Sequence, residues 1–250
     1  MGKDAEQKKD IQNLLEDWPY DSEKLCVRKI RGKDGKKKIQ LRIEMGVLQM
    51  EITGRPDGKR PNGHASLLDF YMAESKKESN FSLDSETCIA LQMEALQYYH
   101  RRISFLELGD YDKARKDAER NLELFDCVKQ YASEEEDRMA LEQYRPFVIG
   151  HRIRASVLQS LEDGAYDRAL VDIEDGIEEI QEFFKEFDRP DLVEESEEIT
   201  FLKEWATEIR KDRPKSLLQD LKDQLREAVA LEDFERAAEL RDRLGTLPGN

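Results

Sequence analysis

The chain has 250 residues, of which 39% are charged, and its net charge at pH 7 is −15. This charged fraction is well above the ordinary one and indicates long amphipathic helices with solvated outer faces. No apolar stretch approaches the length of a signal-peptide core or a membrane span. The isolated Cys26, Cys88 and Cys127 have neither zinc-like spacing nor the pattern of a disulfide framework. We therefore expect a reduced, cytoplasmic protein with no metal and no cofactor.

The charge is divided unevenly along the chain. From Lys24 to Arg60, twelve Lys or Arg residues stand against four Asp or Glu, a net charge of +8; subtracting this from −15 leaves −23 for the remainder. A basic N-terminal module on an acidic body favours either an anionic partner for the basic part or internal charge complementarity. Both readings stay open at this point.

The N-terminal region contains the predicted β structure. Residues 4–16 form a short amphipathic helix that ends before Pro19. Three segments then read as antiparallel strands, at 24–30, 37–45 and 47–53, with turn glycines between the first two. One buried and one solvated face are predicted by the alternation of Ile39, Leu41 and Ile43 with Gln40, Arg42 and Glu44. We expect the following helix, around residues 64–77, to cover this sheet.

A basic loop lies between the third strand and that helix. Residues 54–64, GRPDGKRPNGH, contain two turn dipeptides and two prolines, and they lead into a helix N-terminus. Free backbone N–H groups there, with Arg55, Lys59 and Arg60, can hold an anion. The competing reading is a solvated loop that keeps the sheet edge soluble.

The rest of the chain is predicted to be helical, and one four-residue pattern recurs in it. The predicted helices are 84–108, 111–131, 134–161, 166–187, 190–211, 215–230 and 233–244. The pattern aromatic-acid-base-Ala begins three of them, as YDKA at 111–114, YDRA at 166–169 and FERA at 234–237. Gly109 and Gly164 supply the left-handed residue that ends the preceding helix. With the aromatic ring between the helices and a small Ala at their crossing, each copy predicts a tight antiparallel hairpin.

The first two copies resemble tetratricopeptide-repeat hairpins. The matching positions are Gly109, Tyr111, Ala114 and Leu122, and then Gly164, Tyr166, Ala169 and Ile177. The two glycines are 55 residues apart, whereas the family repeat has 34. We describe residues 81–213 as an acidic, TPR-like helical body with lengthened helices, and no peptide-binding groove is inferred from the resemblance.

The third copy resembles the UVR motif, a helical hairpin named after the UvrB and UvrC excision-repair proteins and found in bacterial-type proteins. The matching residues of 221–247 include Leu221, Leu225, Ala228, Phe234, Ala237, Ala238, Leu240 and Leu244. In that family the motif is a protein–protein contact in which one hairpin from each partner forms a four-helix arrangement. The resemblance implies partner binding, or homodimerisation, through residues 215–247. The implied partner-binding residues are Leu221, Leu225, Phe234, Ala237, Ala238 and Leu244.

Helical spacing agrees with this. Leu218, Leu221, Leu225 and Val229 form one stripe, and Phe234, Ala237, Ala238, Leu240 and Leu244 are expected to face it. A two-helix hairpin cannot bury both stripes alone, so a second hairpin or the acidic body must cover the remainder.

We find no motif that points to catalysis. His64, His100 and His151 are far apart in the sequence, and there is no phosphate-loop ending, nucleophile elbow or metalloprotease signature. The sequence therefore predicts a non-enzymatic α+β protein, predominantly α-helical, with three parts. These are a basic N-terminal α+β module with a three-stranded antiparallel sheet (1–80), the TPR-like body (81–213) and the UVR-like hairpin (214–250). The function predicted is an adaptor or scaffold, and the alternative is a DNA-repair or nucleic-acid-binding accessory protein that uses the basic module; no membrane partner is expected.

Overall fold

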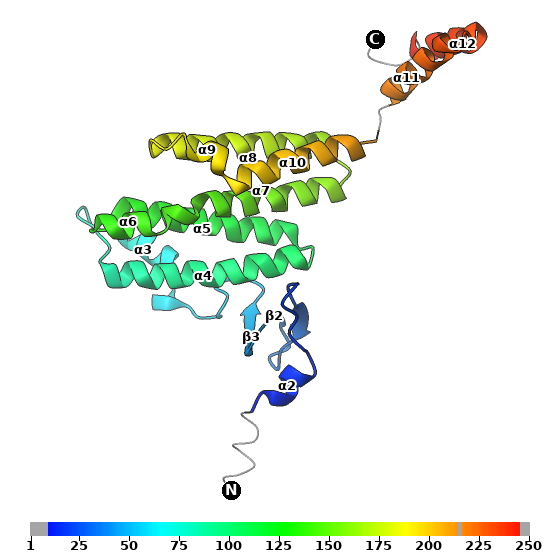
Figure 1. The fold of residues 1–250 in the computed structure, drawn as a ribbon. Helices are drawn as coiled ribbons and strands as arrows, with labels where there is room; N and C mark the ends of the chain where they lie inside the picture. The colour runs from blue at the N-terminus through cyan, green and yellow to red at the C-terminus, as the bar shows by residue number, and fades with distance from the viewer. Residues whose placement is uncertain (1–9, 215–216, 246–250) are drawn as a thin grey trace. The chain divides into compact units, whose positions relative to one another are not determined.

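The computed structural model describes residues 10–214 and 217–245. It contains two compact units, Met1–Trp205 and Ala206–Asn250. The first unit holds a small sheet and a stack of helices, and the second holds a helical hairpin (Figure 1). This confirms the predicted fold class, predominantly helical with a small antiparallel sheet.

The sheet has the predicted strand order. Strands β1 (Val27–Arg31), β2 (Lys37–Ile43) and β3 (Gly46–Glu51) pair antiparallel in the order β1-β2-β3. Ile39 lies opposite Lys29 on one side and Met50 on the other. The short helix α2 (Gln12–Glu16) precedes the sheet; it falls within the helix predicted at 4–16, whose first six residues lie outside the described part of the chain.

The sheet faces differ from the prediction in two ways. Gln40 and Arg42 are buried as well as Ile39 and Leu41, whereas Ile43 is exposed. The polar side chains of this second face are buried together with their hydrogen-bond partners. Gln40 accepts a hydrogen bond from Arg28 at 2.8 Å, and Arg42 donates to the carbonyl of Trp18 at 2.8 Å. Strand alternation alone does not reveal such a polar layer.

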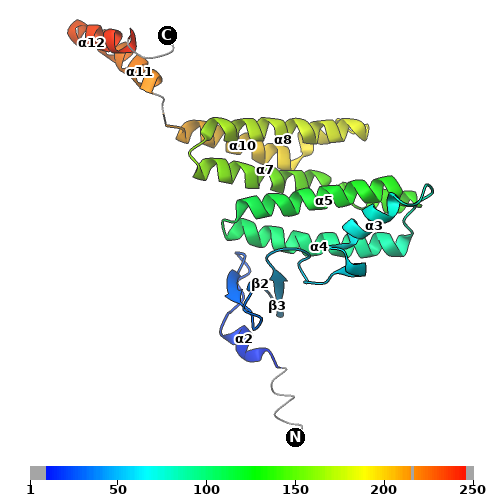
Figure 2. The same cartoon turned by 180° about the vertical axis from the view of Figure 1, so that it is seen from behind.

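The expectation that the helix after the basic loop covers the sheet is also wrong. The apolar face of the sheet packs on α4 (Ser85–Glu107), where Ile39, Leu41 and Met50 share a core cluster with Phe105. Helix α3 (Leu67–Ser75), preceded by the 3-10 turn η1 (Pro61–Gly63), packs instead on α4 and α5. Figure 2 shows α3 beside these two helices. Helix α4 has 23 residues against nine in α3, so it offers the sheet a longer face to pack on.

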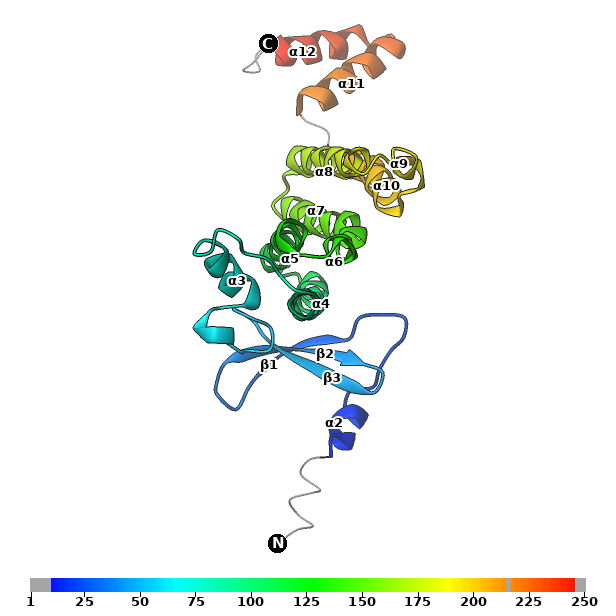
Figure 3. The same cartoon turned by 90° about the vertical axis from the view of Figure 1, so that its left-hand side faces the viewer.

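The helical body is a stack of antiparallel hairpins. Viewed nearly end-on, α4, α5, α7 and α8 follow one another in order away from the sheet (Figure 3). Helices α4 and α5 form one hairpin, and α7 and α8 form another, as the repeated pattern predicts. The remaining bounds are α5 (Tyr111–Tyr131), α6 (Glu135–Ala140), η2 (Glu142–Tyr144), α7 (Arg145–Glu162), α8 (Tyr166–Glu186), α9 (Leu192–Glu195) and α10 (Glu197–Asp212).

Two predicted helices are broken. The predicted helix at 134–161 is divided into α6, η2 and α7, because Pro146 at the start of α7 cannot continue a preceding helix. The one at 190–211 is divided at Ser196, which is extended (ψ 118°). The hydroxyl of Ser196 accepts a hydrogen bond from the Ile199 N–H at 3.2 Å and so caps α10. Within the described part of the chain, no helix is both long and apolar enough to cross a membrane.

Candidate functional site

The C-terminal hairpin consists of α11 (Leu217–Ala230) and α12 (Phe234–Gly245). The Asp233 N–H donates to the Ala228 carbonyl at 2.9 Å and the Glu232 N–H to the Val229 carbonyl at 3.1 Å, the pair of bonds that defines a Schellman motif. The Asp233 side chain caps α12 by accepting from the Arg236 N–H at 3.1 Å. The chain therefore reverses within three residues.

The same turn geometry occurs at all three copies of the repeated pattern. Gly109, Gly164 and Glu232 have φ values of 71°, 68° and 57°, each two residues before the aromatic residue. In the third copy a glutamate takes the left-handed conformation that favours glycine. The small residue of the pattern is buried in each case, at Ala114, Ala169 and Ala237. The sequence pattern therefore encodes the turn and the close helix approach, as predicted.

The hairpin has a small core of its own. Leu221 and Ala228 of α11 pack with Ala237, Leu240 and Leu244 of α12, and Leu225 lies half-buried against them. Four of the six predicted partner-binding residues, Leu221, Leu225, Ala237 and Leu244, thus contribute to closing the hairpin itself.

The other two predicted partner-binding residues are exposed. Phe234 is 68% exposed, and Ala238 on the same flank of α12 is exposed as well. Within the hairpin, Phe234 and Ala238 therefore do not pack against the α11 stripe, contrary to the prediction. Tyr111 and Tyr166 are half-buried at the corresponding positions, because the stacked body supplies further helices.

Exposed apolar side chains gather at the turn of the hairpin. Val229 is 52% exposed and Leu231 is 73% exposed, and both lie within five residues of Phe234. We call Val229, Leu231 and Phe234 the apolar turn. Leu231 was absent from the predicted site residues, although its place beside Glu232 in the helix reversal favours an exposed position. An apolar group of this kind is typical of a contact surface.

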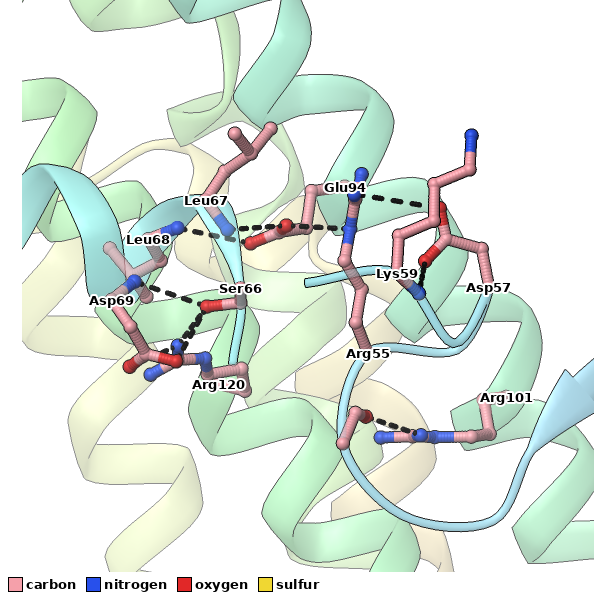
Figure 4. A network of polar contacts seen from close by, with 11 residues as sticks. Arg55, Asp57, Lys59, Ser66, Leu67, Leu68, Asp69, Glu94, Arg101 and Arg120 are labelled. Carbon is pink, nitrogen blue, oxygen red and sulfur yellow. Dashed lines mark hydrogen bonds and ion pairs between the residues drawn. The ribbon is translucent and has the colours of Figure 1, made fainter. Parts of the chain in front are cut away.

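The basic loop forms a second candidate site, and its structure centres on Glu94 of α4 (Figure 4). This carboxylate is fully buried and accepts hydrogen bonds from the Leu67 N–H at 2.8 Å and the Leu68 N–H at 3.2 Å, in the first turn of α3. Arg55 Nε lies 2.9 Å from Glu94 Oε2 as an ion pair. The helix N-terminus and Arg55 thus hold an anion, and that anion is the protein's own carboxylate.

Binding of an external anion by the basic loop stays a prediction, and it now depends on Lys59 and Arg60. Lys59 and Arg60 are both exposed, and the Lys59 ammonium points away from the Glu94 network (Figure 4). Arg60 donates to the Gly63 carbonyl at 3.2 Å.

Several other basic residues of the N-terminal module have internal partners. Lys29 pairs with Asp110 at 2.8 Å, and the Arg28 guanidinium lies 4.0 Å from the centre of the Trp18 ring. Arg42 is bound to backbone carbonyls. These contacts favour the internal-complementarity reading of the +8 charge over a nucleic-acid surface, which requires side chains free to reach phosphates.

The titratable groups show what chemistry is available. Burial raises the pKa of both the Cys88 and the Cys127 thiol to about 11, so neither forms a thiolate readily at neutral pH. Burial, followed by the nearby Arg102 and Arg154 guanidinium groups, lowers the pKa of His151 to about 3. Among the residues that the structure describes, no group of three or more His, Cys, Asp or Glu is arranged to hold a metal ion.

Comparison with known families gives one match. Residues 215–247 match the family model described as the UvrB/uvrC motif. No curated protein and no solved structure matches the chain. The match confirms the resemblance stated for the third copy of the pattern, and it covers the hairpin alone.

Proposed function

We propose that this chain is a non-enzymatic adaptor or scaffold whose C-terminal hairpin binds a protein partner, most simply a second copy of itself. The observation that carries the proposal is the apolar turn, in which Val229, Leu231 and Phe234 are all more than half exposed. This surface lies within a matched UvrB/uvrC motif.

The energetics support an association role. Fully burying a Val, Leu or Phe side chain contributes about 1.5–3 kcal/mol, so covering the exposed parts of the apolar turn contributes roughly 4 kcal/mol per hairpin. The hairpin core does not use this surface, since it is formed by Leu221, Ala228, Ala237, Leu240 and Leu244. Association therefore adds burial without requiring the hairpin to open.

The resemblance supports the same function. In the UVR family the motif is a contact between proteins, with one hairpin from each side. We propose Phe234 and Ala238 as residues of the contact itself and the other four predicted residues as supports of the hairpin shape. The three free cysteines are consistent with action in a reducing compartment.

The proposal is tested by affinity capture from the native cell with the full chain and with a chain lacking residues 215–250. We expect specific partners, or untagged copies of the chain, with the full chain alone. A substitution of Phe234 by Ser in the full chain separates loss of the surface from loss of the segment. If capture is the same for all three proteins, the hairpin is not the binding element and the proposal fails.

A further inference from the structure

An open apolar groove in the helical body lies outside both candidate sites. It has a volume of about 750 Å³ and lies among α4, α5, η2 and α7. Leu96 and Tyr99 line one wall from α4, and Tyr144 and Phe147 line the other. Leu96, Tyr144 and Phe147 are 43%, 53% and 36% exposed, so solvent reaches both walls. A small-molecule site encloses most of its ligand, and this groove therefore fits a larger occupant.

The apolar surface continues beyond the groove along α4. Ile89, Met93 and Leu96 follow one another at steps of four and three residues, so they lie on one face of the helix. Ile89 and Met93 are both more than half exposed, and Met139 is exposed next to the groove residue Ala140. Exposed methionines are common at binding surfaces, because the unbranched side chain adapts its shape to a partner. An apolar surface of this extent indicates a protein contact.

The wall opposite α4 is formed by a segment that the repeat resemblance does not contain. Leu141, Gln143 and Tyr144, in and beside η2, line the groove together with Ala140 of α6. In the end-on view, α6 lies between α4 and α7 (Figure 3). The two turn glycines of the body are 55 residues apart against 34 in the family repeat, and α6 and η2 lie in the added length. The groove is therefore a feature of this chain.

One end of the surface is acidic. Glu86 precedes Ile89 by three residues and so continues the exposed face of α4. Ser85 donates to Asp137 Oδ2 at 2.6 Å, which holds the start of α4 against the first turn of α6. Glu86 and Glu136 are both exposed, and neither side chain has a partner among the described residues. Two unpaired carboxylates beside an apolar surface favour an occupant that carries positive charge at that end.

We propose that this surface, Ile89, Met93, Leu96 and the groove beside them, binds an amphipathic helix of a partner protein that carries lysine or arginine at one end. The apolar row of the helix fills the groove and packs on the exposed face of α4, as in other helix-in-groove contacts. The basic end lies against Glu86. An anionic membrane surface is disfavoured, because the same carboxylates repel it.

The length of the surface sets the length of the occupant. From Ile89 to Tyr99 helix α4 rises about 15 Å, which is about three turns. A partner helix of about 14 residues covers this span and presents its apolar side chains every third and fourth position. The surface is separate from the apolar turn, so it gives the chain a binding element independent of the hairpin.

The test uses a fluorescent peptide of about 14 residues with leucines at every third and fourth position and lysines and alanines elsewhere. Fluorescence anisotropy compares it with a scrambled peptide of the same composition and with a peptide in which glutamate replaces each lysine. We expect the intact chain to bind the amphipathic lysine peptide at micromolar concentration and at least tenfold more tightly than either control. No binding at millimolar concentration, or equal binding of the scrambled peptide, overturns the proposal.

Two pairs of variants locate the contact. Leu96→Gln is expected to weaken binding of the lysine peptide at least tenfold, whereas Val171→Gln, at an exposed position of α8 outside the groove, leaves it unchanged. Glu86→Gln is expected to weaken binding at least threefold, whereas Glu178→Gln makes the same charge change on the exposed face of α8 without effect. Circular dichroism checks that each variant keeps its helix content. Binding that survives Leu96→Gln, or equal effects within either pair, contradicts the assignment.

Two further measurements distinguish other occupants. Leu96→Gln is expected to keep the association state of the wild type in sedimentation velocity; its conversion to a monomer would assign the groove to a second copy and overturn the proposal. The wild type is expected not to sediment with phosphatidylglycerol vesicles, and vesicle binding that Leu96→Gln abolishes would assign the surface to a membrane instead. Ala238→Glu changes the hairpin alone and is expected to bind the lysine peptide like the wild type, so the two binding proposals fail or stand separately.

Discussion

Replacing Glu94 by Gln tests how the basic loop is held. The wild-type carboxylate binds two backbone N–H groups of α3, at 2.8 and 3.2 Å, and the Arg55 guanidinium at 2.9 Å. Gln has the same shape, but its amide oxygen serves only part of this set and its NH₂ group faces other donors. Breaking a buried pair by removing one partner costs about 3–5 kcal/mol. Arg55 is 11% exposed and retains Asp57 at 3.5 Å, so we expect the lower end, about 3 kcal/mol.

Urea unfolding followed by circular dichroism measures this loss, and hydrogen exchange at the Leu67 and Leu68 amides shows where it occurs. Asp57→Asn is the matched control, because it removes the weaker contact of the same Arg55 and is expected to cost less than about 1 kcal/mol. A Glu94→Gln variant no less stable than Asp57→Asn would refute the reasoning.

Three further predictions concern packing, pH and the turn. Gly176→Ala should destabilise the chain by about 1–2 kcal/mol in thermal melts, because the new Cβ would lie 2.5 Å from Ile153 Cγ1. Gly150→Ala, whose new Cβ would have its nearest atom at 3.4 Å, should instead stabilise the chain by up to about 1 kcal/mol. A change in stability of the same sign for both variants would contradict the packing argument. The folded-state pKa of His151 is about 3, below its ordinary 6.5, so the unfolded chain binds a proton first and stability falls as the pH drops below 6.5. Chemical unfolding of the wild type should show a free energy of unfolding lower by up to about 2 kcal/mol at pH 5 than at pH 7, and His151→Gln should remove this difference. A His151→Gln variant with the pH dependence of the wild type would disprove the prediction. Glu232→Gly should stabilise the hairpin by about 0.5–1 kcal/mol, because glycine accepts φ 57° without strain; lower helicity of the hairpin by circular dichroism would count against it.

The local parts of this fold were predictable from the sequence. Helix α5 has the predicted bounds, Tyr111–Tyr131, and the strands and the three hairpins lie close to where the alternation and the repeated four-residue pattern place them. The break at Pro146 carried a clear signal in the proline itself. The signal for the break at Ser196 was weaker, because a serine marks the start of a helix only where its hydroxyl caps the first turn.

The parts that depend on tertiary contacts were not predictable. Nothing in the pattern around Arg55 shows that Glu94, thirty-nine residues later, supplies the anion at the start of α3. The exposure of Phe234 follows from how many helices surround its turn, which the four-residue pattern does not encode. The burial of Arg102 likewise depends on how the helices pack, and an arginine on a helix gives no signal that its Nε and Nη1 are buried without a hydrogen-bond partner among the described residues.

The most direct test of the adaptor proposal is sedimentation velocity of the intact chain across a concentration series, at low and high micromolar protein. Ala238→Glu adds one negative charge to the exposed flank of α12 beside Phe234 and keeps a good helix former. Arg236→Gln makes the same change in net charge two residues away, on another flank of the helix. We predict that the wild type and Arg236→Gln self-associate with increasing concentration, and that Ala238→Glu remains a monomer with unchanged helix content. Monomers for all three proteins, together with unchanged cellular capture by Ala238→Glu, would contradict the proposal that this hairpin is the binding element.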